Sequence, residues 1–375
     1  MAIIDHVVSI VIGGQQVDGW ISYEIDSSMT EPSDSFVLVR PFDRDAWNLC
    51  RLDSRVRVTI DDTVMIDGFI DTRETDAEGG TMQITGRDKA GRLVQESVPQ
   101  VVFAGLKLTQ IAEKIVSPWF SKVVLSDARN RLVRRGKKGS KAPTGNEPIV
   151  LDTAQSTRLD PGQMRWAALE EIVGRAGYIM WSSADGSEFI IGKPNYNQAP
   201  QVVIAHPEPG SSRRATCKSL RITESIADMY SRIIAVGSGG TVEDFGPNAA
   251  SRVGDARNNP DNVDGVGRDF TRAKRLILPE QAIRSADEAK RYAAQEMRRR
   301  SFGRLSISAT MPGHGQVLTG SAPTLFAPNT MAQVIHEELG FSQPCLIYSC
   351  KYRVDRKAGY VTDLMLVPSG TEFAP

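Results

Sequence analysis

Residues 53–88 constrain the fold of this chain more than any other stretch, because apolar and polar side chains alternate there in three short runs. This period of two predicts strands with one buried and one exposed face. Turn-forming residues separate the runs, first Asp61-Asp62-Thr63 and then Glu78-Gly79-Gly80. The three strands therefore predict an antiparallel meander, which must pack against a second layer or close into a barrel to bury its apolar face.

Three more strands are predicted before the meander, at residues 6–12, 20–26 and 36–40. Gly13 and Gly14 can adopt the positive φ angles of a tight turn, so we expect a hairpin there between the first two strands. The first hundred residues thus hold about six antiparallel strands, which predicts a small barrel or sandwich.

The apolar period changes to that of a helix after this domain. One helix is predicted from the spacing of Leu108, Ile111, Ala112 and Ile115, and Pro118 ends it.

A second helix is predicted to start after Asp160, with Pro161 in the first helical position and Gln163 completing a capping box. Gly177 is placed to end this helix. A β-hairpin is expected next, with strands at residues 178–181 and 188–191.

Strands return in the second half of the chain, at residues 201–205, 219–224, 232–236, 305–309, 331–336, 346–355 and 360–368. Residues 237–269 are rich in Gly, Asn, Asp and Pro and are predicted to be mobile. A further helix should follow the capping box of Ser285 and Glu288. Its apolar face would comprise Ala289, Tyr292, Ala293 and Met297.

These patterns predict an α+β fold that is mainly β, with a β-rich domain at each end and helical and loop-rich segments between them. The predicted divisions are residues 1–100, residues 101–200 with a basic loop at 127–160, residues 201–236 plus 303–375, and an inserted loop and helix at 237–302.

Composition excludes several classes of protein. Lys plus Arg equals Asp plus Glu at 45 each, so no global field attracts nucleic acid. The start lacks the features of a signal peptide, and no apolar run reaches the roughly 20 residues that span a bilayer, so we expect folding in the cytoplasm without membrane insertion. The cysteines are too scattered for a disulfide framework or a zinc site and are interpreted as buried thiols: Cys50, Cys217, Cys345 and Cys350.

Residues that could carry catalysis or bind a cofactor all have simpler interpretations. The Gly-rich segments 237–240 and 265–267 do not lie between a parallel strand and a helix, as a dinucleotide site requires. No G-x-S-x-G elbow occurs. The histidines are interpreted as four unrelated residues: His6, His206, His314 and His336. The acids that could pair for glycoside hydrolysis are interpreted as turn residues or as the exposed side of a sheet: Asp61, Asp62, Asp67 and Asp71. We therefore expect no catalytic residues, no cofactor and no metal.

Two basic clusters are the features that suggest phosphate binding. One is the triplet Arg298-Arg299-Arg300, and the other comprises Arg129, Arg131, Arg134, Arg135, Lys137, Lys138 and Lys141. Aromatic residues that could stack on bases are absent near the larger cluster, which argues against sequence reading. A solvated loop or a dock for an acidic partner is the favoured interpretation, and weak channel electrostatics easing the passage of DNA is the alternative.

Several sequence segments, taken in order, resemble segments of the baseplate hub proteins of contractile-tailed phages. This is the Mu-like hub and late-control-D group, which includes the hub part of type VI secretion spike proteins. The segments are LDSRVRVTIDDTVMIDGFIDT, ITGRDKAGRLVQ, GLKLTQIAEKIVSPW, MRWAALEEIVGRAGYIMWSSADGSEFIIGKP and LFAPNTMAQVIHEELGFSQPCLIYSCKYRVDRKAGYVTDLMLVPSGTEF. The chain departs from many relatives in having Phe326 and Ala327, rather than a Trp, before Pro328-Asn329. It contains nothing similar to their lysozyme or spike extensions.

The resemblance implies two tube-type antiparallel β-barrel domains per subunit and a homotrimer that forms a ring of six barrels around a channel. The implied role is a structural, non-enzymatic hub between the six-fold tail tube and the three-fold central spike. Its partners would be the spike, the tube or a tube adaptor and other baseplate proteins, with DNA and the tape-measure protein passing in transit, and its location the virion tail baseplate. The rival hypotheses are a tail-associated cell-wall or polysaccharide hydrolase and a nucleic-acid-binding module.

Overall fold

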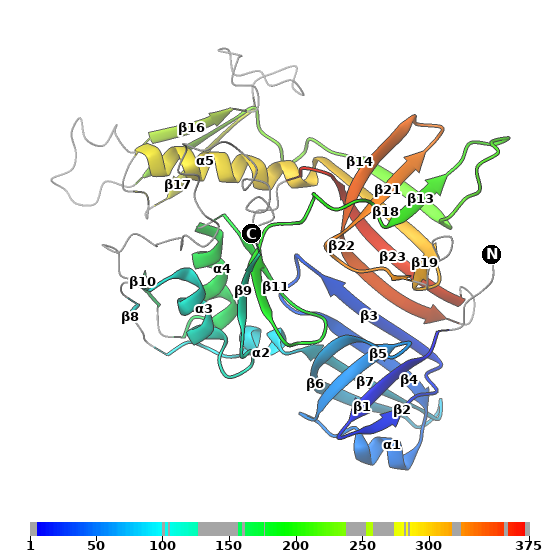
Figure 1. Cartoon of the computed structure of the whole chain (residues 1–375). Helices are drawn as coiled ribbons and strands as arrows, with labels where there is room; N and C mark the ends of the chain where they lie inside the picture. Colours follow the sequence, from blue (N-terminus) through cyan, green and yellow to red (C-terminus); the bar gives the residue numbers. More distant parts are fainter. Residues whose placement is uncertain are drawn as a thin grey trace, which may run out of the picture. The chain divides into compact units, whose positions relative to one another are not determined.

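The computed structural model describes residues 6–99, 102–103, 106–126, 157–159, 162–175, 177–237, 253–257, 274–280, 283, 286–316, 324–355 and 359–371. The chain forms two compact units, shown with the element labels in Figure 1. Unit 1 comprises Met1–Arg221 and Ser308–Ser369, and unit 2 comprises Ile222–Ile307 and Gly370–Pro375. The α+β, mainly β fold class is confirmed.

Unit 1 opens with seven strands: β1 (Val8–Ile12), β2 (Gln15–Val17), β3 (Ser22–Ser28), β4 (Ser35–Pro41), β5 (Arg55–Ile60), β6 (Thr63–Asp76) and β7 (Thr81–Asp88). The predicted meander is confirmed, since β5 pairs with β6 and β6 with β7, both antiparallel. Two short helices, α1 (Arg44–Leu49) and α2 (Ala90–Gln95), were not predicted, because six residues are too few for a helical period to emerge.

The predicted N-terminal hairpin is wrong in its second strand. Gly13 and Gly14 do form the turn, with φ of 57° and 85°, but β1 pairs across it with the short β2. β3 pairs instead with β4 and with a strand from the end of the chain. The turn chemistry identified the reversal correctly, but the three residues of β2 are too short to show alternation.

The middle of unit 1 packs helices on a small sheet. Its elements are β8 (Val102–Phe103), α3 (Leu108–Val116), β9 (Val123–Ser126), β10 (Thr157–Arg158), α4 (Arg165–Arg175), β11 (Ile179–Ser182) and β12 (Phe189–Gly192). The predicted helix α3 and the hairpin of β11 and β12 are confirmed. β9, which was not predicted, pairs in parallel with β12. Phe189 of β12 is fully buried in one apolar core with residues of α3 and α4, and its ring contacts Trp166 of α4.

Helix α4 starts later than predicted, at Arg165 rather than near Pro161. The backbone of the preceding residues is already paired, because Val98 N donates to Gln163 O at 2.8 Å and Met164 bridges to Ser97. The predicted end is confirmed: Gly177 has φ of 75°, and its N–H donates to Gly174 O as in a Schellman motif.

The rest of unit 1 is a second set of strands, of which β14 and β18 run on into unit 2: β13 (Val202–His206), β14 (Ser219–Glu224), β18 (Leu305–Pro312), β19 (Gly315–Gln316), β20 (Thr324–Leu325), β21 (Thr330–His336), β22 (Phe341–Asp355) and β23 (Gly359–Pro368). Residues 216–218 link β13 to β18, since Thr216 N donates to Ala205 O and Lys218 N to Thr310 O. The order β18-β23-β22-β21-β13 is thereby closed into a circle of hydrogen bonds.

The long strand β22 belongs to both sets of strands (Figure 1). Its first part pairs with β21, and its second part pairs with β3 from Ser349↔Ser28 to Val354↔Tyr23. A bulge between Ile347 and Ser349 lies where the partner changes. Apart from β19 and β20, which pair with each other, the two sets therefore form one continuous sheet of thirteen strands.

Unit 2 contains β15 (Arg232–Gly237), β16 (Val253–Arg257), β17 (Arg275–Glu280), α5 (Ala286–Ser301) and a 3-10 turn (Phe302–Arg304). The sheet order is β16-β15-β17, so β15, which the sequence analysis grouped with the second β domain, pairs within unit 2. The predicted helix is confirmed, and its buried residues Ala289, Ala293 and Met297 pack on this sheet. Of the segment predicted to be mobile, most lies outside the described residues, and Val253–Arg257 is a strand.

Candidate functional site

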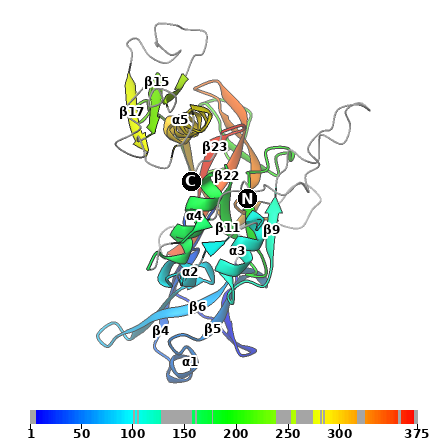
Figure 2. The same ribbon diagram turned by 90° about the vertical axis from the view of Figure 1, so that its left-hand side faces the viewer.

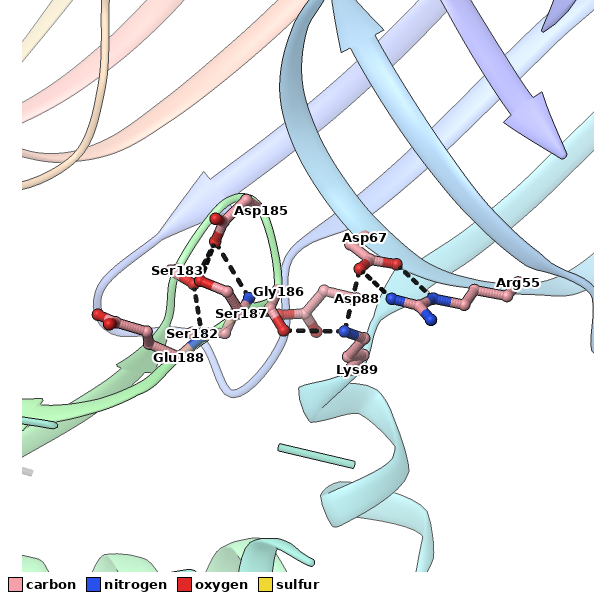
Figure 3. Close-up of polar contacts among 10 residues, drawn as sticks. All are labelled: Arg55, Asp67, Asp88, Lys89, Ser182, Ser183, Asp185, Gly186, Ser187 and Glu188. Carbon is pink, nitrogen blue, oxygen red and sulfur yellow. Dashed lines mark hydrogen bonds and ion pairs between the residues drawn. The ribbon is translucent and has the colours of Figure 1, made fainter. Parts of the chain in front are cut away.

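A buried ion cluster joins the first strands of unit 1 to the β11–β12 hairpin (Figure 3). Asp67 of β6 is 1% exposed and accepts from Arg55 Nε at 2.9 Å, from Arg55 Nη2 at 2.7 Å and from Lys89 Nζ at 3.0 Å. Burial opposes ionisation of Asp67, but the hydrogen bonds from Arg55 and Lys89 outweigh it, so its pKa is lowered. We call Arg55, Asp67, Lys89 and Gly186 the Asp67 junction.

The hairpin reaches this cluster through a glycine. Lys89 Nζ donates to Gly186 O at 2.8 Å, so the same ammonium holds the carboxylate and the hairpin backbone. Gly186 has φ of +62°, and a Cβ there would lie 2.8 Å from Asp67 Cβ. Only glycine combines this backbone conformation with this close approach.

The hairpin loop is ordered by its own side chains. Asp185 Oδ1 accepts from Ser183 Oγ at 2.7 Å, from Ser187 N at 3.1 Å and from Ser187 Oγ at 2.8 Å. The hydrogen bond from Ser183 is the main reason that the pKa of Asp185 is lowered. The loop therefore presents Gly186 in a fixed shape.

A second pair of acids, Asp34 and Asp88, lies buried beside the junction and was not identified from the sequence. Asp34 accepts from Ser27 Oγ at 2.7 Å and from Ser28 N at 2.9 Å. Asp88 accepts from Ser33 Oγ at 2.6 Å and also from Ser182 Oγ, another link to the hairpin. Burial raises the pKa of both acids. The one available signal was the spacing of Asp88 and Gly91, whose N–H the carboxyl accepts as in a helix cap.

The acids considered for hydrolysis are held apart in separate roles. Asp61 and Asp62 are turn residues with φ of 49° and 64°, as predicted. Asp71 pairs with Arg87 at 2.6 Å. The placement of Asp67 on an exposed face is wrong, because the hairpin, distant in sequence, covers that part of β6.

The interpretation of the histidines as unrelated is also wrong, because the fold brings them together in two pairs. The ring centroids of His6 and His314 are 4.7 Å apart, and those of His206 and His336 are 5.0 Å apart. The second pair follows from the parallel register of β13 and β21, which places His206 opposite His336. Pairing of distant strands leaves no spacing signal in the sequence.

His6 and His314 belong to a hydrogen-bonded network that we call the His314 cluster, comprising His6, Tyr23, Asp61, His314 and Thr362, all of them buried except Asp61. His314 N donates to His6 Nε2 at 3.0 Å, which leaves His6 Nδ1–H to donate to Asp61 Oδ2 at 2.6 Å. Thr362 Oγ1 donates to Gly313 O, so it accepts from His314 Nδ1–H at 3.0 Å.

The imidazole of His314 is thereby fixed in one neutral tautomer, with Nε2 accepting from Tyr23 Oη–H at 2.5 Å. Burial, and secondarily the nearby His6, lowers the pKa of His314 to about 3. Burial also raises the pKa of Tyr23. The network joins β3 and the β5–β6 turn to the terminal strands of unit 1.

The remaining candidate residues do not form a site within the described part of the chain. The seven basic residues Arg129 to Lys141 lie outside the described residues. In the triplet, Arg299 and Arg300 pair with Glu296 of the same helix at 3.4 and 3.3 Å. The four cysteines are confirmed as buried free thiols. Across the described ranges, no three His, Cys, Asp or Glu side chains are grouped to hold a metal, and no helix is both long and apolar enough to span a bilayer.

Comparison with known proteins agrees with the resemblance noted in the sequence. Residues 7–88 match the family model of the Mu phage baseplate assembly protein GpP-like, N-terminal domain. This range contains β1 to β7 and two members of the Asp67 junction, Arg55 and Asp67. No curated protein sequence matches the chain.

Solved structures extend the likeness to the whole fold. A tail protein from Neisseria meningitidis MC58 superposes with a TM-score of 0.77 at 21% identity, covering 98% of each chain. The 43 kDa tail protein of prophage MuSo2 from Shewanella oneidensis gives 0.75 at 20% identity, covering 98% of this chain and 99% of that one. A Francisella PdpA-VgrG complex gives 0.56 at 8% identity, covering 99% of this chain and 59% of the other. The chain therefore has the same fold as the two tail proteins, and its first seven strands match the GpP-like N-terminal model.

Proposed function

We propose that this protein is a structural hub of a contractile tail baseplate, in which three copies form a ring between the tail tube and the central spike. The observation that carries the proposal is the likeness to two tail proteins over 98% of the chain, together with the GpP-like match of residues 7–88. Two barrels in each of three subunits would give the ring six barrels, which match the six-fold tube. The three subunits themselves would match the three-fold spike.

The shared strand β22 supports this arrangement. A ring of six barrels made by three subunits needs the two barrels of one subunit to keep a fixed relation, and β22 hydrogen-bonds to both sets of strands through one continuous backbone. The Asp67 junction and the His314 cluster add ion pairs and hydrogen bonds between strands and loops of the same unit. The central groups of the two sites, Asp67 and His314, are buried and hydrogen-bonded, which suits a structural role better than catalysis.

The experiment that tests the proposal has two measurements. Light scattering of the purified protein should give about three times the chain mass of 41.0 kDa, alone or after co-expression with the spike protein. Quantitative mass spectrometry of purified tails should find the chain and the spike protein in equal copy number. A protein that stays monomeric with the spike present, or that is absent from tails, would overturn the proposal, and clearing of peptidoglycan by the pure protein would favour the hydrolase instead.

A further inference from the structure

The sheet of unit 2 has an outer face, on the side opposite α5. Ile233 and Ala235 of β15 are buried in the core beneath α5, so Ile234 and Val236, which alternate with them, lie on the other side. Figure 2, which looks along the axis of α5, shows β15 and β17 on one side of the helix. Helix α5 therefore covers one face of the sheet and does not cover the outer face.

This outer face carries apolar side chains from all three strands, with Asp255 of β16 beside Ile234. The register places Ile277 of β17 beside Ile234, and Val253 of β16 beside Val236. Ile277 is 63% exposed and Val253 is 41% exposed. A sheet with one solvated face normally carries polar side chains there, so an apolar row on both faces indicates a layer on each side.

The chemistry of the missing layer is indicated by the charges at one end of the row. Arg257, Arg232 and Arg275 occupy one register row across β16, β15 and β17. Arg232 Nε is paired with Asp255 Oδ2 at 3.0 Å, whereas no described carboxylate pairs with the exposed Arg275. The outer face thus combines an apolar row with one guanidinium that has no acid partner among the described residues.

We propose that the outer face binds a segment of a partner protein that carries an apolar row followed by a carboxylate, with the carboxylate on Arg275. Interface cores are more apolar than the rest of a protein surface and are enriched in Arg, which binds carboxylates in strong, often bidentate pairs. Nucleic acid fits poorly, because its affinity comes mainly from phosphates on cations, and the apolar row of this face offers phosphates no contact. A second copy of this face also fits poorly, since its carboxylate, Asp255, is already held by Arg232.

The inference rests on the proposed function in one respect, which is that the partner is another component of the tail. The test uses the variants Ile277→Asp and Arg275→Glu, with Leu339→Asp as matched control, because Leu339 is also 63% exposed but lies in a turn of unit 1. Each variant is measured for Tm, for mass in solution and for its amount in purified tails.

We expect all three variants to keep the Tm and the mass of the wild type. Both outer-face variants should fall at least tenfold in their amount in tails, while Leu339→Asp stays at the wild-type level. Equal amounts of all variants would overturn the inference. So would a lowered Tm of Ile277→Asp, which would assign the covering layer to this chain itself, or a changed mass, which would assign it to a second copy. Absence of the wild type from tails would instead overturn the proposed function and the partner assigned from it.

Discussion

The Asp67 junction and the His314 cluster both connect distant strands of unit 1, but the central group of the junction is ionised and that of the cluster is neutral. Asp67 stays ionised between Arg55 and Lys89, with its pKa lowered. His314 stays neutral between a tyrosine and a threonine, with its pKa lowered to about 3. Removing one member of the charged junction leaves an uncompensated buried charge, whereas the neutral cluster loses only hydrogen bonds and packing. The comparison shows that burial alone does not set the energetic role of a polar group.

The largest effect should come from Asp67→Asn. This change leaves the ammonium of Lys89, only 12% exposed, without its carboxylate, so we expect the free energy of unfolding to fall by about 3 kcal/mol. The measurement is urea unfolding at pH 7. The matched control is Asp71→Asn in the same strand, whose partner Arg87 is 33% exposed, and it should cost about 1 kcal/mol or less. Equal losses in the two variants would remove the distinction between the junction and an ordinary surface ion pair.

Lowering the pH should change the stability contributed by the His314 cluster at a higher pH than that contributed by the Asp67 junction. Unfolded His314 takes up a proton near its ordinary pKa of 6.5, while the folded form does so only near 3. Stability should therefore fall by up to about 1.4 kcal/mol per pH unit as the pH decreases below 6.5. Between pH 6.5 and 5 the wild type should lose about 2 kcal/mol that a His314→Gln variant does not lose.

The junction provides the control for this experiment. The lowered pKa of Asp67 keeps its stabilisation in place until the pH falls below the ordinary carboxyl range, where it is lost. Asp67→Asn should thus lower stability by the same amount at pH 6.5 and at pH 5. If instead His314→Gln keeps the wild-type slope, His314 is protonated in the folded protein and the neutral description of the cluster is wrong.

A smaller effect is expected from Gly186→Ala, which tests the close approach at the junction. The added Cβ meets Asp67 and also strains a backbone with positive φ, so the loss in unfolding free energy should be about 2 kcal/mol. Gly80→Ala is the matched control, because φ is +60° there but no atom lies within 4 Å of the added Cβ. It should cost about 1 kcal/mol. Equal costs at the two positions would mean that the hairpin can move away from Asp67 without penalty.

The sequence predicted the elements of the junction better than the junction itself. Alternation in the meander and the spacing in α3 report which face of an element is buried, and both were read correctly. They do not report what covers that face. Asp67 was therefore assigned to the exposed side of β6, although Gly186, more than a hundred residues later, packs against it.

The His314 cluster was harder still to predict, because its members come from opposite ends of the chain. His6 and His314 meet only through the pairing of β3 with β22, which no local pattern encodes. The resemblance to hub proteins implied that two β domains lie together, but not which side chains meet between them. Register, rather than propensity, decides such contacts.

The smallest expected effect is that of Asp34→Asn, which asks whether residue type or charge state sets the cost of losing a buried acid. Burial, and then the neighbouring Asp88, raises the pKa of Asp34, so its folded form is protonated at a pH where the unfolded form is ionised. Its contribution to stability is therefore fully present below the ordinary carboxyl pKa and is lost as the pH rises from there to the raised pKa.

Asparagine is neutral in both states, and it can keep both contacts of Asp34 by accepting from Ser28 N and donating to Ser27 Oγ. We expect the free energy of unfolding at pH 7 to change by about 1 kcal/mol or less, or to rise, in urea unfolding alongside Asp67→Asn. The same substitution would then cost about 3 kcal/mol at one buried aspartate and almost nothing at another in the same domain. A loss at Asp34 as large as that at Asp67 would mean that Asp34 is ionised when folded, and that charge state does not distinguish the buried acids of this protein.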